Sequence, residues 1–246
     1  MPSRRIDLID TLRGLALVWM TLFHFFFDLN EFHYLRQDFH NDPLWTLQRT
    51  VILSGFLLCA GMGQAVALQQ RQDWTRFWRR WAQVAACAVL VTIGSWWMFP
   101  RSFIYFGVLH GMAAMLILAR VTAAWGKWLW PLGLIAVLLP QLAPQVLEHS
   151  AWEALFNGRW LNWLGWITHK PITEDYVPLL PWMGVVWWGV ASGQWLLRQA
   201  RLREWQASGA GLGLAALGRW SLAYYMLHQP VMIGALMLVG AAMQSM

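Results

Sequence analysis

The sequence predicts an all-α fold, a polytopic transmembrane helix bundle of about seven spans. Composition is the first reason: hydrophobic residues make up 58% of the 246 residues and charged residues only 12%, about half the charged share of a soluble domain. The second reason is length, because apolar runs of about 20 residues recur along the chain, enough to cross a ~30 Å hydrocarbon core. We therefore expect one membrane-embedded domain over residues 1–246.

Each expected span is an apolar run bounded by polar or charged residues. The first run follows Arg4 and Arg5 like a signal peptide, but Asp10 and Arg13 interrupt it and no small-residue cleavage site follows, so we interpret it as a retained helix. The expected spans are residues 11–29, 46–68, 82–99, 102–121, 125–142, 177–197 and 219–240, with an outer loop at 143–176.

Loop charge predicts the orientation of these spans. The loop at residues 28–45 is acidic, whereas the loops at 69–81 and 198–220 are rich in arginine. Because basic loops stay in the cytoplasm, their alternation predicts the N-terminus inside and the C-terminus outside. The net charge of +6 is explained by this topology. Since no basic run alternates with aromatics in a polar domain, nucleic acid is not an expected partner.

Ionisable side chains inside membrane spans are costly and are hypotheses of function by default. The first span carries Arg13, His24 and Asp28. At about 100° per residue, Arg13 and His24 lie on one face, about 16 Å apart along the axis, and Asp28 lies one turn beyond His24. We expect His24 to be the catalytic histidine, with the Asp28 carboxylate orienting its ring.

Two further histidines, His110 and His228, lie at a similar depth in other spans, so the three could meet near mid-membrane. A single membrane histidine more often makes an interhelical hydrogen bond. Thr21, Ser54 and Ser221 are candidate hydroxyl partners. The full set expected to bind substrate or acyl-CoA is Asp10, Arg13, Arg49, Arg76, Arg79, Arg80, His110, Asp175, Arg219 and His228.

The sequence gives no sign of a resident cofactor. Cys59 and Cys87 both lie in apolar segments without metal-type spacing, so no metal site is expected. The chain also lacks a Walker-type loop, a dinucleotide fingerprint and a nucleophile elbow.

Several segments resemble integral-membrane acyltransferases. In the first helix of these enzymes an arginine precedes a histidine by ten intervening residues, and Arg13 and His24 in RIDLIDTLRGLALVWMTLFH have this spacing. The segment LGRWSLAYYMLHQP resembles the last-helix motif of the same superfamily. The stretches DLNEF, IYFGVLH and DYVPLLPWMGVV resemble the bacterial relatives of the heparan-α-glucosaminide N-acetyltransferase catalytic domain. This likeness covers nearly the whole chain.

The resemblance implies a multi-pass protein of the bacterial inner membrane that takes an acyl group, with acetyl favoured, from cytoplasmic acyl-CoA. It implies a hydroxyl or amine acceptor on the far side, such as a small molecule or a glycan, and a catalytic histidine. In the lysosomal member of this family the catalytic histidine lies in the loop after the first helix. The resemblance therefore makes His33 and His40 alternatives to His24 as the catalytic histidine. The sequence leaves homo-oligomer formation open.

The working hypothesis places the phosphates of acyl-CoA near Arg71, Arg76, Arg79 and Arg80, whose guanidinium groups bind phosphate bidentately. An equal alternative is that these arginines only mark the cytoplasmic side. His24 would deprotonate the acceptor or carry the acyl group, and both routes stay open. Other classes consistent with the same histidines are a proton-coupled transporter and a haem-binding electron carrier.

Overall fold

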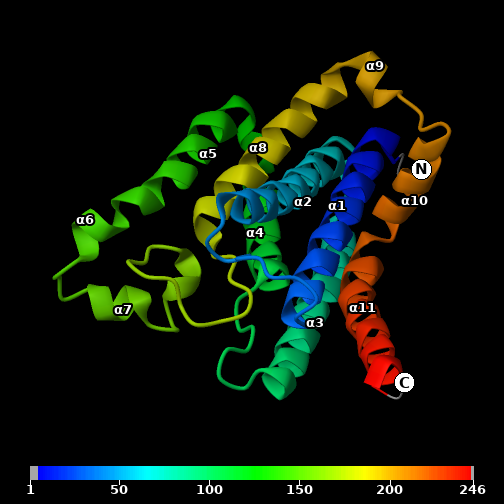
Figure 1. Cartoon of the computed structure of the whole chain (residues 1–246). Coiled ribbons are helices and arrows are strands. Elements are labelled where there is room, and N and C mark those ends of the chain that lie inside the picture. Colours follow the sequence, from blue (N-terminus) through cyan, green and yellow to red (C-terminus); the bar gives the residue numbers. More distant parts are fainter. Residues whose placement is uncertain (1–4, 245–246) are drawn as a thin grey trace. The chain divides into compact units, whose positions relative to one another are not determined.

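The computed structural model describes residues 5–244, which form helices and no β-strand (Figure 1). The all-α prediction is confirmed. Within residues 5–244, five helical segments are long and apolar enough to cross a membrane. They are Asp7–Glu31, Pro43–Gln69, Trp74–Met98, Val108–Leu147 and Ser221–Ala242. Two expected spans, 102–121 and 125–142, overlap the fourth segment, and the sixth corresponds to the 20-residue helix α8 (Leu179–Arg198). The count of seven spans and their orientation stay predictions.

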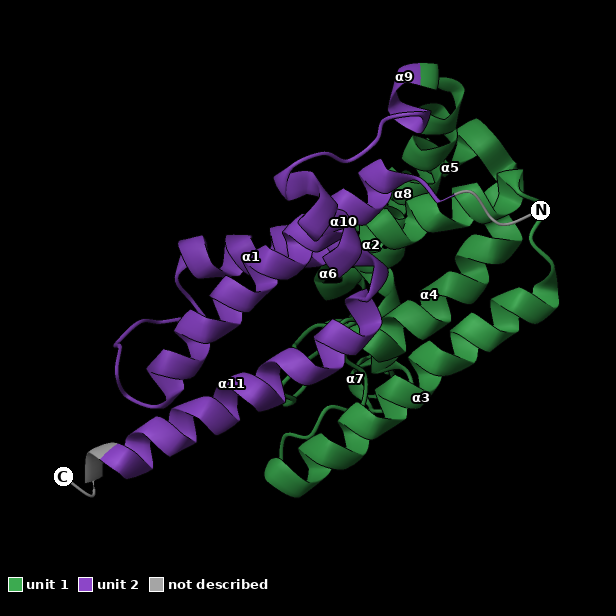
Figure 2. Cartoon of the chain, turned by 90° about the vertical axis from the view of Figure 1, so that its right-hand side faces the viewer, with its two compact units in different colours: residues 1, 57–200 green, residues 2–56, 201–246 purple. Residues whose placement is uncertain are grey.

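The chain divides into two compact units (Figure 2). The terminal unit contains Pro2–Phe56 and Arg201–Met246, and the central unit contains Leu57–Ala200. Helix α2 (Pro43–Gln69) begins in the terminal unit and ends in the central unit.

The core of the terminal unit forms around one face of α1 (Asp7–Glu31). Leu17, Met20 and Phe23 recur at helical spacing on α1 and pack with Phe39 and Ile52. All five are buried. This packing fixes the rotation of α1, and therefore the direction in which His24, one residue after Phe23, leaves the helix.

Helix α10 (Ala210–Arg219) packs closely against the first half of α1. Two glycines permit the approach: a Cβ on Gly14 would lie 2.0 Å from the Leu214 carbonyl oxygen, and a Cβ on Gly218 would lie 1.9 Å from the Asp10 carbonyl oxygen. Small residues at such contacts let membrane helices approach backbone to backbone. The sequence predicts a loop at residues 198–220, but Ala210–Arg219 form a helix. Ten residues are too few for a sequence pattern to indicate a span, and the cytoplasmic side of this segment stays a prediction.

Helix α11 (Ser221–Gln244) follows α10 after a break at Trp220 and lies beside α1 (Figure 1). The contacts between the two helices follow the same N-to-C order along α1 and along α11. Thr21 bonds Tyr224, and His24 contacts His228. Farther along, Gly240 lies near the Tyr34 hydroxyl group. Helices α1 and α11 therefore run parallel, an arrangement that favours an odd number of crossings.

Apart from the short α9 (Ala200–Arg203), which crosses the boundary between the units, the central unit holds the remaining helices of residues 5–244. In order after α2 they are α3 (Trp74–Met98), α4 (Val108–Thr122), η1 (Ala123–Trp128), α5 (Leu129–Leu138), η2 (Leu139–Leu142), α6 (Ala143–Leu147), α7 (Glu153–Asn157), η3 (Asn162–Leu164) and α8. Helix α5 packs along α8, and α3 packs along α4. The expected outer loop at 143–176 thus contains short helices.

Helix α4 begins at Val108, so the expected start of a span at Ser102 is wrong. Phe106, two residues before the helix, pairs with a distant segment: Val177 N–H donates to the Phe106 carbonyl at 3.1 Å. The Asp175 carboxylate then accepts the Val108 N–H at 2.7 Å, which satisfies a free donor of the first turn. The start of α4 is therefore determined by a capping residue that lies 67 positions farther along the chain.

Candidate active site

Two histidines meet between α1 and α11 in the terminal unit. The ring centroids of His24 and His228 are 5.2 Å apart, and the rings are inclined by 59°. His228 is buried and His24 is partly buried. One buried nitrogen on each ring, Nδ1 of His24 and Nε2 of His228, has no hydrogen-bond partner within residues 5–244. Buried polar atoms normally have partners, so this pair is a candidate site for a ligand.

His228 is held in place by its own helix. Its Nδ1 lies 2.8 Å from the Tyr225 carbonyl oxygen. Since a carbonyl only accepts, Nδ1 carries the proton in the neutral ring and Nε2 carries the lone pair. The Tyr224 ring lies parallel to the His228 ring, with an interplanar angle of 8° and centroids 5.9 Å apart.

A hydroxyl pair links the same two helices one turn earlier. The Thr21 hydroxyl donates to the Leu17 carbonyl at 2.8 Å, so it accepts from the Tyr224 hydroxyl at 2.7 Å. This bond ties the ring that stacks on His228 to α1. Thr21, expected as a hydroxyl partner of the site, is therefore close to the histidine pair.

Asp28 is buried in the last turns of α1. Its carboxyl group lies within hydrogen-bonding reach of the Gln229 side chain, and within residues 5–244 no hydrogen bond joins it to His24. The expected orientation of the His24 ring by Asp28 is thus not seen. The structure instead places Asp28 against the residue that follows His228.

The charged residues near the start of α1 bind one another. Arg13 Nη1 donates to Asp10 Oδ1 at 3.0 Å and lies 3.5 Å from the Gly218 carbonyl oxygen. Arg219 contacts Asp7 at 3.3 Å and Asp10 at 3.7 Å. Two carboxylates and two guanidinium groups compensate each other, so Asp10, Arg13 and Arg219 join α1 to α10. The sequence had expected these three residues to bind substrate or donor.

His110 and Asp175, also expected to bind substrate, lie in the central unit and make bonds there. The Thr92 hydroxyl donates to the Ile104 carbonyl at 2.8 Å and so accepts from His110 Nε2 at 2.9 Å. His110 Nδ1 accepts the Gly107 N–H at 3.3 Å. Both ring nitrogens are therefore engaged, as the interhelical alternative for a membrane histidine predicts.

A loop cluster supports this region of the central unit. The Asn162 amide donates to the Tyr105 hydroxyl at 2.8 Å, and the Tyr176 hydroxyl donates to the Asn162 carbonyl at 2.5 Å. Burial raises the pKa of both phenols, so both remain protonated near neutral pH. The cluster fixes the segment that carries Asp175 to α4.

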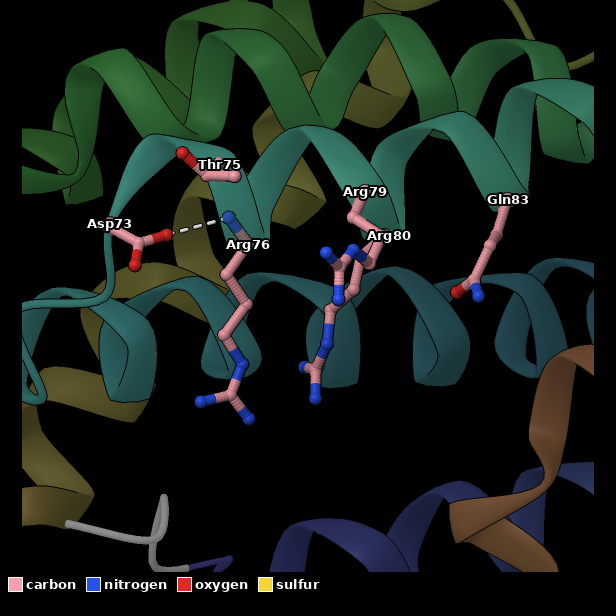
Figure 3. A pocket seen from close by; sticks show the side chains of 6 residues that line it. All are labelled: Asp73, Thr75, Arg76, Arg79, Arg80 and Gln83. Carbon is pink, nitrogen blue, oxygen red and sulfur yellow. Dashed lines mark hydrogen bonds between the residues drawn. The ribbon is translucent and has the colours of Figure 1, made fainter.

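Three expected donor-binding arginines share one pocket on α3. Arg76, Arg79 and Arg80 extend from one side of the helix (Figure 3). With Asp73, Thr75 and Gln83 they line a pocket of about 380 Å³. Asp73 caps the helix by accepting the Arg76 N–H at 2.6 Å. Arg49, the remaining expected binder, is exposed on α2.

A family model decides which class of protein carries this site. The model described as heparan-alpha-glucosaminide N-acetyltransferase, catalytic, matches residues 5–230. The chain belongs to this family. The match includes α1, α10 and the part of α11 that bears His228. Neither a curated protein nor a solved structure matches the chain.

Membership in the heparan-alpha-glucosaminide N-acetyltransferase catalytic family, with several apolar helices, makes the chain a membrane protein of an acyltransferase family. Within residues 5–244 no group of three His, Cys, Asp or Glu side chains is placed to hold a metal. The rival loop histidines, His33 and His40, are both exposed. His33 lines a pocket of about 550 Å³ on the loop after α1, and the His40 ring lies 6.3 Å from the Phe27 ring.

Sequence reasoning missed Tyr224 and Tyr225, whose rings lie beside His228, and Gln229, which lies near Asp28. A signal was present, because Tyr224 lies four residues before His228 and so on the same helix face. The carbonyl of Tyr225 could not be recognised, since any residue type supplies one.

Proposed function

We propose that the chain is an integral-membrane acyltransferase that moves an acetyl group from cytoplasmic acyl-CoA to a hydroxyl or amine acceptor, preferably a sugar, on the periplasmic side of a bacterial inner membrane. Family membership supports acetyl transfer. No permanently bound cofactor is required, because the acetyl group arrives activated as a thioester. His24 is the proposed catalytic histidine.

The observation that carries the proposal is the pair of His24 and His228, each with a buried nitrogen that lacks a hydrogen-bond partner within residues 5–244. Acyl transfer from a thioester removes one proton from the acceptor, forms the new bond to the carbonyl carbon and releases the thiol. Imidazole accepts and returns a proton near neutral pH. A hydroxyl or amine seated between the rings would supply the missing hydrogen bonds.

The experiment is incubation of the purified protein with radiolabelled acetyl-CoA and a membrane extract, followed by separation of lipid, glycan and protein. We expect label in a glycan or lipid-linked acceptor with wild-type protein, and none with His24→Ala. Absence of label in every fraction, with protein that binds acetyl-CoA, would contradict the proposal. Equal labelling with His24→Ala would place the chemistry elsewhere.

The arginine pocket on α3 is proposed to bind the phosphates of acyl-CoA. Because the side chains are exposed, we expect Arg79→Gln to raise the KM for acetyl-CoA about fivefold, the equivalent of ~1 kcal/mol for one exposed charge contact. Acetyl-pantetheine, a donor without the nucleotide phosphates, should be used equally well by wild type and variant. Initial rates with the two donors check this.

The matched control for Arg79→Gln is Arg201→Gln, which removes an exposed arginine from a different basic segment, the short helix α9. We expect it to leave the KM for both donors unchanged. An Arg79→Gln variant with an unchanged KM would show that the arginines of α3 serve only membrane orientation.

A further inference from the structure

The active-site pair contains two imidazoles, and the contacts of the two rings differ. The contacts of His228 define its tautomer and its orientation, whereas those of His24 within residues 5–244 define neither. This difference bears on which nitrogen receives the proton of the acceptor. The inference rests on the acyl transfer proposed above and names the base within that site.

The tautomer of His228 follows from its hydrogen bond. Nδ1 donates to the Tyr225 carbonyl at 2.8 Å, which leaves the lone pair on Nε2. Nε2 is buried and has no hydrogen-bond partner within residues 5–244. A general base needs this arrangement, because one ring nitrogen is anchored while the other is ready to accept a proton.

The orientation of His228 is supported by two neighbouring tyrosine rings. The Tyr224 ring lies parallel to it, and the Tyr225 ring centroid is 5.8 Å away. The position of the Tyr224 ring is held from α1, since its hydroxyl is bonded to Thr21 at 2.7 Å. Preorganisation of this kind spares the reaction a reorganisation cost.

Within residues 5–244, His24 has no comparable anchor. Its buried Nδ1 has no hydrogen-bond partner there, and Asp28 lies near Gln229 rather than bonded to the imidazole. Its ring contacts are Phe23, at 5.8 Å between centroids, and His228. Neither contact selects a tautomer, so His24 is suited to hold the acceptor or to carry the acyl group.

We propose that Nε2 of His228 is the general base of the transfer and that Tyr224 and Thr21 are its positioning residues. Nε2 takes the proton of the acceptor hydroxyl or amine as the acceptor heteroatom bonds to the acyl carbonyl carbon. The carbon–sulfur bond breaks, and the departing thiolate takes the proton back from the imidazolium. The products are the acylated acceptor and the free thiol, so atoms and charges balance.

The decisive variant is His228→Asn. Its side-chain amide can still donate to the Tyr225 carbonyl but offers no basic nitrogen, so structure is preserved while the base is lost. We expect kcat to fall about 10²–10⁴-fold, with an unchanged KM for acetyl-CoA and normal thermal unfolding in detergent. Loss of an interhelical hydrogen bond alone would cost only about 0.6 kcal/mol, less than a threefold change.

Positioning is tested without removing the imidazole. Tyr224→Phe keeps the parallel ring but loses the bond to Thr21, and Thr21→Val removes the same bond from the other side. We expect each to lower kcat about fivefold without changing the KM, since one misplaced hydrogen bond is worth ~1 kcal/mol, and we expect Thr21→Ser to retain the wild-type kcat. If His228→Asn does not insert into the membrane, the kcat values of Tyr224→Phe and Thr21→Val test the role of His228 instead.

Failure of the inference is distinguishable from failure of the proposed function. If wild-type protein transfers no acetyl group, the function itself is wrong. If wild type is active and His228→Asn keeps a tenth or more of its kcat, transfer stands but His228 is not the base. If Tyr224→Phe and Thr21→Val both keep the wild-type kcat, the positioning role is wrong.

Discussion

Replacement of His24 by alanine is expected to lower the rate of acetyl transfer about 10²–10⁴-fold, the usual effect of removing a group that handles the proton or the acyl unit. The expectation follows from its place opposite His228, with a buried nitrogen that has no partner within residues 5–244. Single-turnover transfer by purified, correctly inserted protein is the measurement. Asp28→Asn should be impaired to a smaller extent, because Asp28 lies near Gln229 rather than bonded to His24.

The matched controls for His24→Ala are His33→Ala and His40→Ala, which remove exposed rings from the loop after α1. Both should retain the wild-type rate. If His24→Ala remains active while either loop variant is inactive, the catalytic histidine lies in the loop after α1. That outcome would also remove the reason for placing the acceptor between α1 and α11.

Among the substitutions proposed for this protein, Gly218→Ala is expected to lower the free energy of unfolding the most. A methyl group there would lie 1.9 Å from the Asp10 carbonyl oxygen and 3.0 Å from the Gly14 nitrogen. Both neighbours are backbone, so α10 must move away from α1. Overpacking typically costs about 1–3 kcal/mol, and we expect the upper end because the contact of Arg13 with the Gly218 carbonyl and the contact of Arg219 with Asp10 depend on this approach.

The control for Gly218→Ala is Gly213→Ala on the same helix, where an added Cβ meets nothing within 4 Å. Both substitutions gain the same helix propensity, about 1 kcal/mol, so their difference isolates the contact. We expect thermal unfolding in detergent to occur at a lower temperature for Gly218→Ala and at an unchanged or higher temperature for Gly213→Ala. Equal unfolding temperatures would mean that α10 does not pack tightly on α1.

Much of the fold could be predicted because long apolar runs in a bilayer allow few structures besides helices. The boundaries failed where a distant residue determines them. Helix α4 begins at Val108 because Asp175 caps it, and no sequence pattern near residues 102–107 indicates that contact. Helix α10 was missed because ten residues are too few for a span, although its glycines and alanines are typical of close helix packing.

The site was predicted in part. Periodicity places Arg13 and His24 on one face of α1, and both face neighbouring helices in the structure. Their partners differ, however: Arg13 contacts α10 and His24 contacts α11. The sequence suggested a continuous functional stripe because it could not show the break at Trp220, where one neighbour of α1 ends and the next begins.

The parallel pairing of α1 with α11 has a consequence for biosynthesis. The residues that build the site are separated by about the whole chain: Thr21 and Tyr224 are 203 positions apart. A ribosome delivers the first helix to the membrane long before the last one exists. The histidine pair therefore cannot form on an incomplete chain, and a polypeptide that stops before α11 would be inserted without a site. Acetyl transfer at the proposed site therefore requires α11.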